Sequence, residues 1–128
     1  MATNDENFSK NLKVLIVEDD VVGRMLLNEI LKDCCKSVSF ARNGKEGVDM
    51  VAADPTFSFI LMDLKMPVMN GYEATKKIRE LGYTNPIFAQ TAYATDEDIE
   101  KIESANFDAY LTKPIKKNTL LDVLKKHL

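Results

Sequence analysis

Short strand-like runs alternate along this chain with longer segments in which apolar residues recur at helical spacing, and this alternation limits the fold more than any other feature. Four runs are largely apolar, while residues 37–41 alternate through Val38 and Phe40. Nearly continuous apolar runs fit strands that are buried on both faces. The pattern therefore predicts an α/β protein with helices on both sides of a parallel sheet. We place the strands at residues 13–17, 37–41, 59–62, 87–90 and 109–112.

The segments between these strands predict helices. We expect helices over about residues 21–34, from Asn43-Gly44 to just before Asp54-Pro55, over 71–81, over 95–105, and along the C-terminal segment that carries Leu120, Leu121, Leu124 and Leu128. The first helix has Val22, Met25, Leu26, Ile30 and Leu31 at helical spacing. Asp20 immediately precedes it and is its expected N-cap.

Length and composition favour one small soluble domain. The 128 residues suit a single core, which we assign to residues 13–128 after a disordered or weakly ordered segment over residues 1–12. The net charge of -3 argues against nucleic-acid binding, which needs clustered Lys and Arg. Neither a signal-peptide h-region nor a membrane-length apolar run is present, and adjacent Cys34 and Cys35 are poorly placed to bridge each other. We expect a cytoplasmic protein with free thiols and no membrane contact.

Polar residues follow four of the predicted strands at the point where each strand ends. They are the acidic triplet Glu18-Asp19-Asp20, Asp63, Thr91 and Lys113. In open parallel sheets, ligands bind beyond the carboxyl ends of the strands, so these side chains should gather at one edge. Carboxylates brought together repel one another unless a cation lies between them, and Mg²⁺ prefers oxygen ligands. The pattern alone leaves the register of the acidic triplet open by one residue.

Four motifs in this order resemble one known family. The motifs are Val17-Glu18-Asp19-Asp20, the segment MDLKMPVMNG over residues 62–71, Thr91-Ala92 and Lys113-Pro114. From Lys13 to the C-terminus the chain resembles the receiver domains of two-component response regulators. The resemblance implies a flavodoxin-like doubly wound sheet of five parallel strands in the order 2-1-3-4-5, with five helices. Alternation by itself also fits the other doubly wound order. The family further implies a cis peptide bond before Pro114.

The resemblance also implies a role for each acidic residue. Asp63 is expected to be the phosphoryl acceptor. Glu18 and Asp19 form the expected Mg²⁺ pair, with Asp19 as a direct ligand, Glu18 acting through water and Asp20 left as the helix cap. Asp63 and the backbone carbonyl of Lys65 complete the implied ligand set.

Two further residues are expected to assist the phosphoryl transfer, and a third is expected to change position in response to it. Thr91 and Lys113 are expected to neutralise and hold the transferred phosphoryl group. Tyr110 corresponds to the aromatic switch partner of Thr91, and the responding surface would comprise the helix over 95–105, the strand over 109–112 and the last helix. The implied phosphodonor is a histidine kinase or a histidine phosphotransfer protein, and a downstream effector would read the result. Such a domain assists its own phosphorylation and dephosphorylation and is not an enzyme acting on external substrates.

Three other functions fit parts of this pattern less well. A flavin-binding electron carrier needs phosphate donors after the first strand, where the acidic triplet would repel phosphate. An aspartate-dependent phosphohydrolase has a second Asp two residues after its nucleophile, where this chain has Lys65. A degenerate receiver used only for docking would not need all of Glu18, Asp19, Asp63, Thr91 and Lys113. A single-domain regulator and a receiver belonging to a larger protein both fit the length, and residues 62–71 and 91–115 favour similarity to hybrid sensor kinases.

Overall fold

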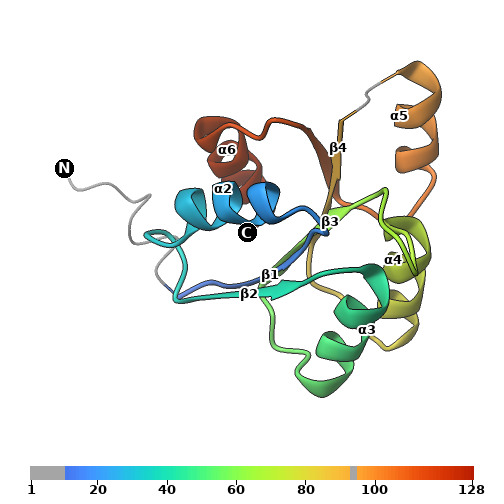
Figure 1. Ribbon diagram of the computed structural model, residues 1–128, viewed down its shortest axis with the longest axis horizontal. Helices are drawn as coiled ribbons and strands as arrows, with labels where there is room; N and C mark the ends of the chain where they lie inside the picture. Colours follow the sequence, from blue (N-terminus) through green and yellow to red (C-terminus); the bar gives the residue numbers. More distant parts are fainter. Residues whose placement is uncertain (1–10, 93–94) are drawn as a thin grey trace.

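The computed structural model describes residues 11–92 and 95–128, which form a five-stranded parallel sheet (Figure 1). The strand order is β2-β1-β3-β4-β5, so the predicted flavodoxin-like order is confirmed. The order reverses at β1, which lies between β2 and β3, and this is the switch point where such sheets bind ligands. The strands are β1 (Lys13–Val17), β2 (Ser37–Ala41), β3 (Phe59–Asp63), β4 (Ile87–Thr91) and β5 (Ala109–Thr112).

Five helices connect the strands and cover both faces of the sheet. They are α2 (Val21–Leu31), α3 (Gly44–Ala53), α4 (Gly71–Glu80), α5 (Asp96–Glu103) and α6 (Lys117–His127). Helices α2 and α6 lie on one face, and α3 and α4 lie on the opposite face (Figure 1). Helix α5 covers that second face near β4 and β5, through Ile102.

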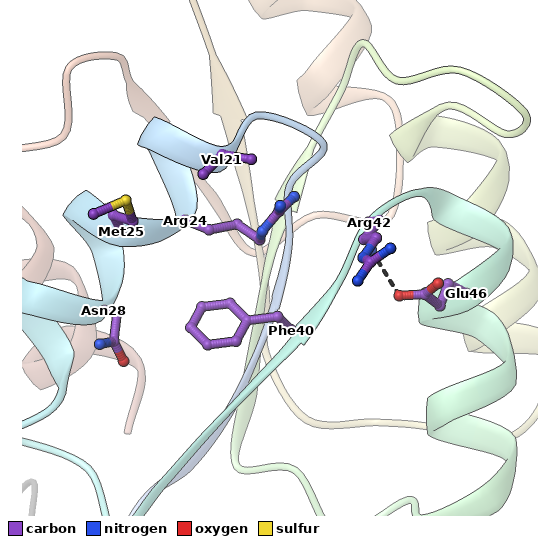
Figure 2. Close-up of a pocket in the computed structure, with 7 residues that line it drawn as sticks. All are labelled: Val21, Arg24, Met25, Asn28, Phe40, Arg42 and Glu46. Atoms are coloured by element: carbon purple, nitrogen blue, oxygen red, sulfur yellow. Dashed lines mark hydrogen bonds between the residues drawn. The ribbon is translucent and has the colours of Figure 1, made fainter.

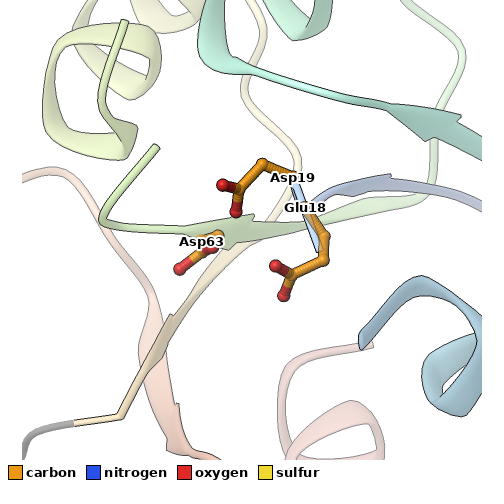
Figure 3. Close-up of side chains that lie close together, drawn as sticks. All are labelled: Glu18, Asp19 and Asp63. Carbon is orange, nitrogen blue, oxygen red and sulfur yellow. The ribbon is translucent and has the colours of Figure 1, made fainter. Parts of the chain in front are cut away.

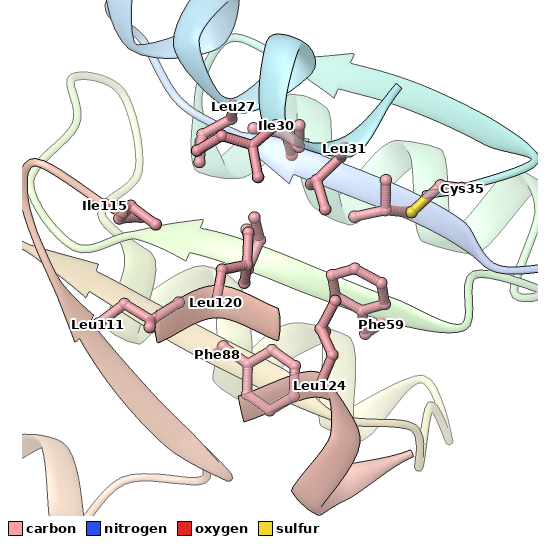
Figure 4. Packing of buried hydrophobic residues seen from close by; sticks show 13 residues of the cluster. Leu27, Ile30, Leu31, Cys35, Phe59, Phe88, Leu111, Ile115, Leu120 and Leu124 are labelled. Carbon is pink, nitrogen blue, oxygen red and sulfur yellow. The ribbon is translucent and has the colours of Figure 1, made fainter. Parts of the chain in front are cut away.

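Alternate residues of each strand supply the two halves of the core. On β1, Val14 and Ile16 face α2 and α6, whereas Leu15 and Val17 face α3 and α4. All four are fully buried, which explains why the sequence of this strand is continuously apolar. The half of the core under α2 and α6 is shown in Figure 4, where side chains from both helices meet those of the sheet, among them Leu27, Phe59, Phe88, Leu120 and Leu124.

Side chains that cap the helices fix where four of them begin. The carboxylate of Asp20 accepts a hydrogen bond from the backbone N–H of Gly23 at 2.9 Å, which confirms the predicted N-cap of α2. Asn43, Asn70 and Thr95 accept equivalent bonds at the start of α3, α4 and α5. Each cap satisfies a backbone donor that the first helical turn would otherwise leave unpaired.

The predicted apolar face of α2 is only partly correct. Ile30 and Leu31 are buried together with Leu27, but Val22, Met25 and Leu26 are 70%, 66% and 43% exposed. The helix also ends at Leu31, earlier than predicted, because Cys34 and Cys35 already belong to the turn that leads into β2. Strands β3 and β4 each extend one residue beyond their predicted ends, so that Asp63 and Thr91 are their last residues.

Both cysteines are free, as expected. The Lys113-Pro114 peptide bond is cis, also as expected. Of the segment predicted to be disordered or weakly ordered, residues 1–10 lie outside the described residues, and Leu12 packs partly buried against the core. Within the described part of the chain, each helix is too short or too polar to cross a membrane.

Candidate functional site

The strand order brings the predicted site residues to one edge of the sheet. Glu18 directly follows β1, Asp63 and Thr91 end β3 and β4, and Lys113 directly follows β5. These strands are neighbours in the order β1-β3-β4-β5. A cavity of about 180 Å³ opens at this edge and is lined by Glu18, Asp19, Asp20, Asp63, Leu64, Lys65, Gln90, Thr91, Ala92 and Lys113. Residues far apart in the sequence therefore share one small polar site.

Three carboxylates converge in this cavity. Glu18, Asp19 and Asp63 each place a carboxylate oxygen within 4.8 Å of the other two (Figure 3). Glu18 and Asp63 are 1% and 5% exposed, while Asp19 is exposed at the rim. Water screens such buried charges poorly, so their repulsion is strong unless a cation compensates it. This set of closely spaced oxygens fits a hard divalent cation such as Mg²⁺.

Lys113 supplies the positive charge that the structure shows at this cluster. Its Nζ atom lies 2.9 Å from Glu18 Oε1 and 3.3 Å from Asp63 Oδ1, so one ammonium group contacts two buried carboxylates. Burial by itself would lower the pKa of Lys113, but its contacts with Glu18 and Asp63 outweigh burial and raise that pKa. Lys113 therefore stays charged at neutral pH.

Asp63 has an unusual protonation equilibrium in this setting. Burial and the neighbouring charge of Glu18 raise the pKa of the Asp63 carboxyl to about 7, although Lys113 opposes the rise. Near neutral pH, in the absence of metal, the carboxyl is therefore close to half protonated. A nucleophilic role requires the ionised form, which any cation bound among these oxygens would favour.

Glycine at position 71 allows the loop after Asp63 to fold tightly against β3. The Gly71 N–H donates to the Leu64 carbonyl at 3.0 Å, which closes the loop back onto the strand end. A Cβ atom at this position would lie 2.1 Å from the carbonyl oxygen of Asp63, far inside contact distance. Only glycine permits this approach, so the Asn70-Gly71 pair both caps α4 and positions the site.

The structure separates the roles within the acidic triplet. The carboxylate of Asp20 caps α2, whereas the carboxylates of Glu18 and Asp19 belong to the cluster with Asp63. Glu18 is held further by Oε2, which accepts from the Asp20 N–H at 3.2 Å, and by its carbonyl, which accepts from Arg24 Nη1 at 2.8 Å. In this geometry, Glu18 and Asp19 are the pair whose carboxylates lie close to that of Asp63.

Lys65, the last predicted ligand, lines the same cavity. The predicted switch residue Tyr110 is placed away from the acidic residues. Tyr110 packs half-buried against a small cluster of Leu64, Ala89 and Ile102, between the sheet and α5.

Sequence reasoning missed two residues of this site. Gln90 lies opposite Asp63 in the β3–β4 pairing and lines the cavity, whereas the sequence pattern predicts only a strand residue at this position. A polar residue at the end of the apolar run Ile87-Phe88-Ala89 was the available signal. Arg24, which holds the Glu18 carbonyl, carried no comparable signal because a helical arginine is usually solvated.

A wider groove of about 690 Å³ lies between α2, β2 and α3 (Figure 2). It is lined by Phe40, Met25 and Val21 together with the charged or polar side chains Arg24, Asn28, Arg42 and Glu46. None of the clustered carboxylates lines this groove. Within the described residues, the carboxylate cluster therefore lies in the smaller polar cavity at the sheet edge.

Comparison with known proteins agrees with this geometry. The family model for the response regulator receiver domain matches residues 14–125. This chain belongs to the receiver domain family. The rice two-component response regulator ORR41 (Oryza sativa subsp. japonica) is 37% identical over 121 residues, which cover 91% of this receiver and 94% of the rice protein. The osmosensing histidine protein kinase SLN1 of Saccharomyces cerevisiae is 33% identical over 127 residues, which cover 94% of this receiver but only 10% of the kinase.

Solved receiver structures are similar in fold over nearly the whole chain. The receiver domain of the Arabidopsis thaliana histidine kinase CKI1, in a complex with Mg²⁺ and BeF₃⁻, superposes with a TM-score of 0.85 at 30% identity and covers 96% of this receiver and 93% of that chain. The chemotaxis protein CheY4 of Vibrio cholerae gives a TM-score of 0.84 at 29% identity, with coverage of 91% and 98%. Relatives thus include both stand-alone regulators and receivers within hybrid kinases.

The raised pKa of Asp63 predicts a pH-dependent effect of removing its charge. The folded receiver binds the Asp63 proton more tightly than the unfolded chain does, because the pKa of this carboxyl is about 7 in the folded state and 3.8 ordinarily. The ionised carboxyl therefore lowers the free energy of unfolding fully above about pH 7. This loss decreases as the pH falls from 7 and disappears below about pH 3.8. In metal-free buffer at pH 8 we expect Asp63→Asn to raise the free energy of unfolding by on the order of 1–3 kcal/mol. The gain should shrink toward zero near pH 4. Urea unfolding at several pH values measures it, with the exposed Asp122→Asn as control, and a gain that does not vary with pH would contradict the assignment.

Proposed function

We propose that this receiver accepts a phosphoryl group on Asp63 from a histidine-phosphorylated protein and passes the signal to an effector. The observation that carries the proposal is one buried carboxylate at the switch point of the sheet, with two further carboxylates within 4.8 Å and the Lys113 ammonium 3.3 Å away. Carboxylates are known nucleophiles toward phosphorus, and the reaction needs little from the protein beyond positioning and charge compensation.

We propose Mg²⁺ as the cofactor. Asp19 and Asp63 would bind it directly, Glu18 through water, and the backbone carbonyl of Lys65 would complete the protein ligands. When bound, the ion would draw the carboxylates together and neutralise charge on the phosphoryl oxygens. The 4.8 Å cluster of oxygens supports the three carboxylates of this set, and the relative crystallised with Mg²⁺ and BeF₃⁻ supports Mg²⁺ as the ion.

The transfer step follows from the positions of the side chains. A carboxylate oxygen of Asp63 forms a bond to phosphorus while the bond from phosphorus to the donor imidazole nitrogen breaks, and that nitrogen keeps the electron pair. Lys113 compensates the negative charge that Asp63 carries into the reaction, and the Thr91 hydroxyl donates to a phosphoryl oxygen. Water later hydrolyses the acyl phosphate at the same site. The receiver therefore assists its own phosphorylation and dephosphorylation and turns over no external substrate.

The surface next to the cavity supports a protein as the phosphodonor. Exposed Val22 and Leu26 of α2 line a second, largely apolar cavity of about 180 Å³ that also contacts Glu18 and Lys113. Exposed apolar groups beside a reactive centre are typical of surfaces that proteins cover. We propose a histidine kinase or a histidine phosphotransfer protein as the partner.

The first test locates the phosphoryl group. Incubation with acetyl phosphate and Mg²⁺ should add one phosphoryl group to the wild-type receiver, and peptide mass spectrometry should place it on Asp63. Asp63→Asn should carry none, whereas the exposed Asp122→Asn should be labelled like the wild type. An adduct that persists in Asp63→Asn would disprove the assignment.

We expect Asp19 to contribute mainly to Mg²⁺ binding and Asp20 mainly to the stability of the fold. Asp19→Asn should weaken Mg²⁺ binding roughly tenfold or more, because it removes a direct charged ligand, with little effect on unfolding. Asp20→Asn should largely retain the cap, and Asp20→Ala should lose about 1 kcal/mol of stability while binding Mg²⁺ nearly normally. NMR titration with Mg²⁺ and urea unfolding give the two readouts. A larger loss of Mg²⁺ affinity in Asp20→Ala than in Asp19→Asn would shift the metal pair by one residue.

We propose that phosphorylation changes the surface formed by α5, β5 and α6, through Thr91 and Tyr110. Residues Ala89 and Thr91 of β4 face the same side of the sheet, and Ala89 pairs with Tyr110 in β5. A phosphoryl oxygen on Asp63 is a strong acceptor that would draw the Thr91 hydroxyl toward it. The space vacated beside β5 would allow Tyr110 to turn from its half-buried position inward. The phosphoryl group shifts this equilibrium only by its differential affinity for the two arrangements.

Thr91→Ala should prevent phosphorylation of Asp63 from changing the position of Tyr110. We expect Asp63 to remain phosphorylatable in Thr91→Ala, while the chemical-shift changes around Tyr110 on phosphorylation fall to a small fraction of those in wild type. Thr112→Ala, at the neighbouring strand end, is the matched control. Equal responses at Tyr110 in wild type and Thr91→Ala would show that the route is wrong.

A further inference from the structure

The buried side-chain amide of Gln90 has an N–H donor for which the described residues provide no acceptor. Gln90 is 1% exposed, at the end of a strand that is buried along its whole length. Its side-chain Nε2 has no hydrogen-bond partner among the described residues. An unpaired buried donor lowers stability, so a retained one calls for an explanation. An apolar residue of similar shape would fit this strand without that loss.

Glu18 presents the complementary deficiency. Its carboxylate is also 1% exposed, and its Oε1 atom has the Lys113 ammonium 2.9 Å away. Among the described residues, this ion pair is the one contact with a donor that the structure shows for Oε1. In the described part of the chain, this buried acceptor of Glu18 therefore relies on a cation that Glu18 shares with Asp63.

The sheet places these two side chains on either side of Asp63. Val17 pairs with Met62 across β1 and β3, so Glu18 follows at the level of Asp63, and Asp63 pairs with Gln90 across β3 and β4. Glu18 and Gln90 also line the same two cavities of about 180 Å³ at this edge. Parallel strands are about 4.8 Å apart, and both side chains are long enough to meet over the shorter Asp63.

We propose that Gln90 is a positioning residue that donates its Nε2–H to Glu18 Oε1 when Lys113 turns to the phosphoryl group on Asp63. This inference rests on the proposed function, because a phosphoryl group brings the charge that would attract Lys113 away from Glu18. Without a substitute donor, Oε1 of Glu18 would lose the ammonium contact that the structure shows for it. Because the Gln90 amide is neutral, it supplies that donor without changing the net charge around the phosphoryl group.

The length of Glu18 gives the proposal a specific structural basis. Its side chain packs beneath α2, where a Cβ atom at Gly23 would lie 3.0 Å from the Glu18 carboxyl carbon. An aspartate at position 18 would keep the charge near the metal cluster but would not reach as far toward Gln90. The proposal therefore depends on the length of the Glu18 side chain and on the space that Gly23 leaves for it.

Gln90 is the only glutamine of the chain, which makes the direct test simple. The receiver is labelled with ¹⁵N at the glutamine side-chain amide, and its single NH₂ resonance pair is followed by NMR during titration with Mg²⁺ and beryllofluoride as the phosphoryl analogue. We expect one of the two protons to shift downfield and its exchange with water to slow about tenfold or more, as for a new hydrogen bond to a charged group. The pair should be absent in Gln90→Met.

Affinity for beryllofluoride gives a second, independent readout. Gln90→Met has a similar shape but no donor, and it should bind beryllofluoride roughly 10- to 100-fold more weakly, while its unfolding midpoint stays the same or rises. Thr75→Val is the matched control, since the Thr75 hydroxyl is also 1% exposed and has no hydrogen-bond partner among the described residues. Thr75→Val should leave beryllofluoride affinity unchanged.

A double-mutant cycle shows whether Gln90 acts through Glu18. In a Glu18→Asp background, Gln90→Met should cause little further loss of affinity, because the shorter carboxylate no longer reaches the amide. Additive losses would mean that Gln90 contacts the analogue or Asp63 directly, and would overturn the proposal. A wild-type receiver whose resonances near Asp63 and Thr91 do not respond to beryllofluoride would instead refute the proposed function. If those resonances respond and the Gln90 amide does not, the inference about Gln90 alone is wrong.

Discussion

The contact of one lysine with two buried carboxylates is the interaction on which the site depends. Glu18 and Asp63 are almost completely buried and lie close enough to repel each other strongly, and Lys113 Nζ is within 3.3 Å of both. This arrangement still leaves Asp63 with a pKa of about 7, so the compensation is incomplete. Incomplete compensation suits the proposed cation site, because the remaining negative charge attracts a cation, and that cation together with Lys113 would then offset the negative charge of a phosphoryl group.

The sheet makes this arrangement possible at little cost elsewhere. Strands β1, β3 and β4 are buried on both faces by apolar side chains, so the backbone that carries the charged residues is rigid. The loop after Asp63 folds back closely enough that only glycine fits at position 71. The two buried carboxylates of the described residues, Glu18 and Asp63, both lie at the carboxyl edge of the sheet. The apolar layers stabilise the fold, and the proposed reactive site lies at the residues that end or directly follow the strands.

Most of the fold was predictable because each level of the sequence pointed to the same answer. Apolar runs, caps such as Asp20, and the order of the motifs all predicted a parallel sheet with its ligands at one edge. The prediction was weakest for α2, where Val22, Met25 and Leu26 have helical spacing but face solvent. Periodicity shows that a helix has an apolar stripe, yet it does not show which part of a broad stripe the sheet will cover. The end of α2 was also misplaced, because the turn into β2 is decided by where that strand docks.

The sequence by itself determined which chemical groups are available at the ends of the strands. It set the alternation that yields five parallel strands, and it set an acidic triplet, Asp63, Thr91 and Lys113 at four strand ends. Only the tertiary structure decided which acids face one another, since the assignment of Asp20 to the cap and of Glu18 and Asp19 to the cluster depends on how α2 leaves the sheet. It alone also placed Gln90 opposite Asp63. The physical reason is that strand register and helix docking are long-range packing outcomes, and they fix distances of a few ångströms that no local pattern encodes.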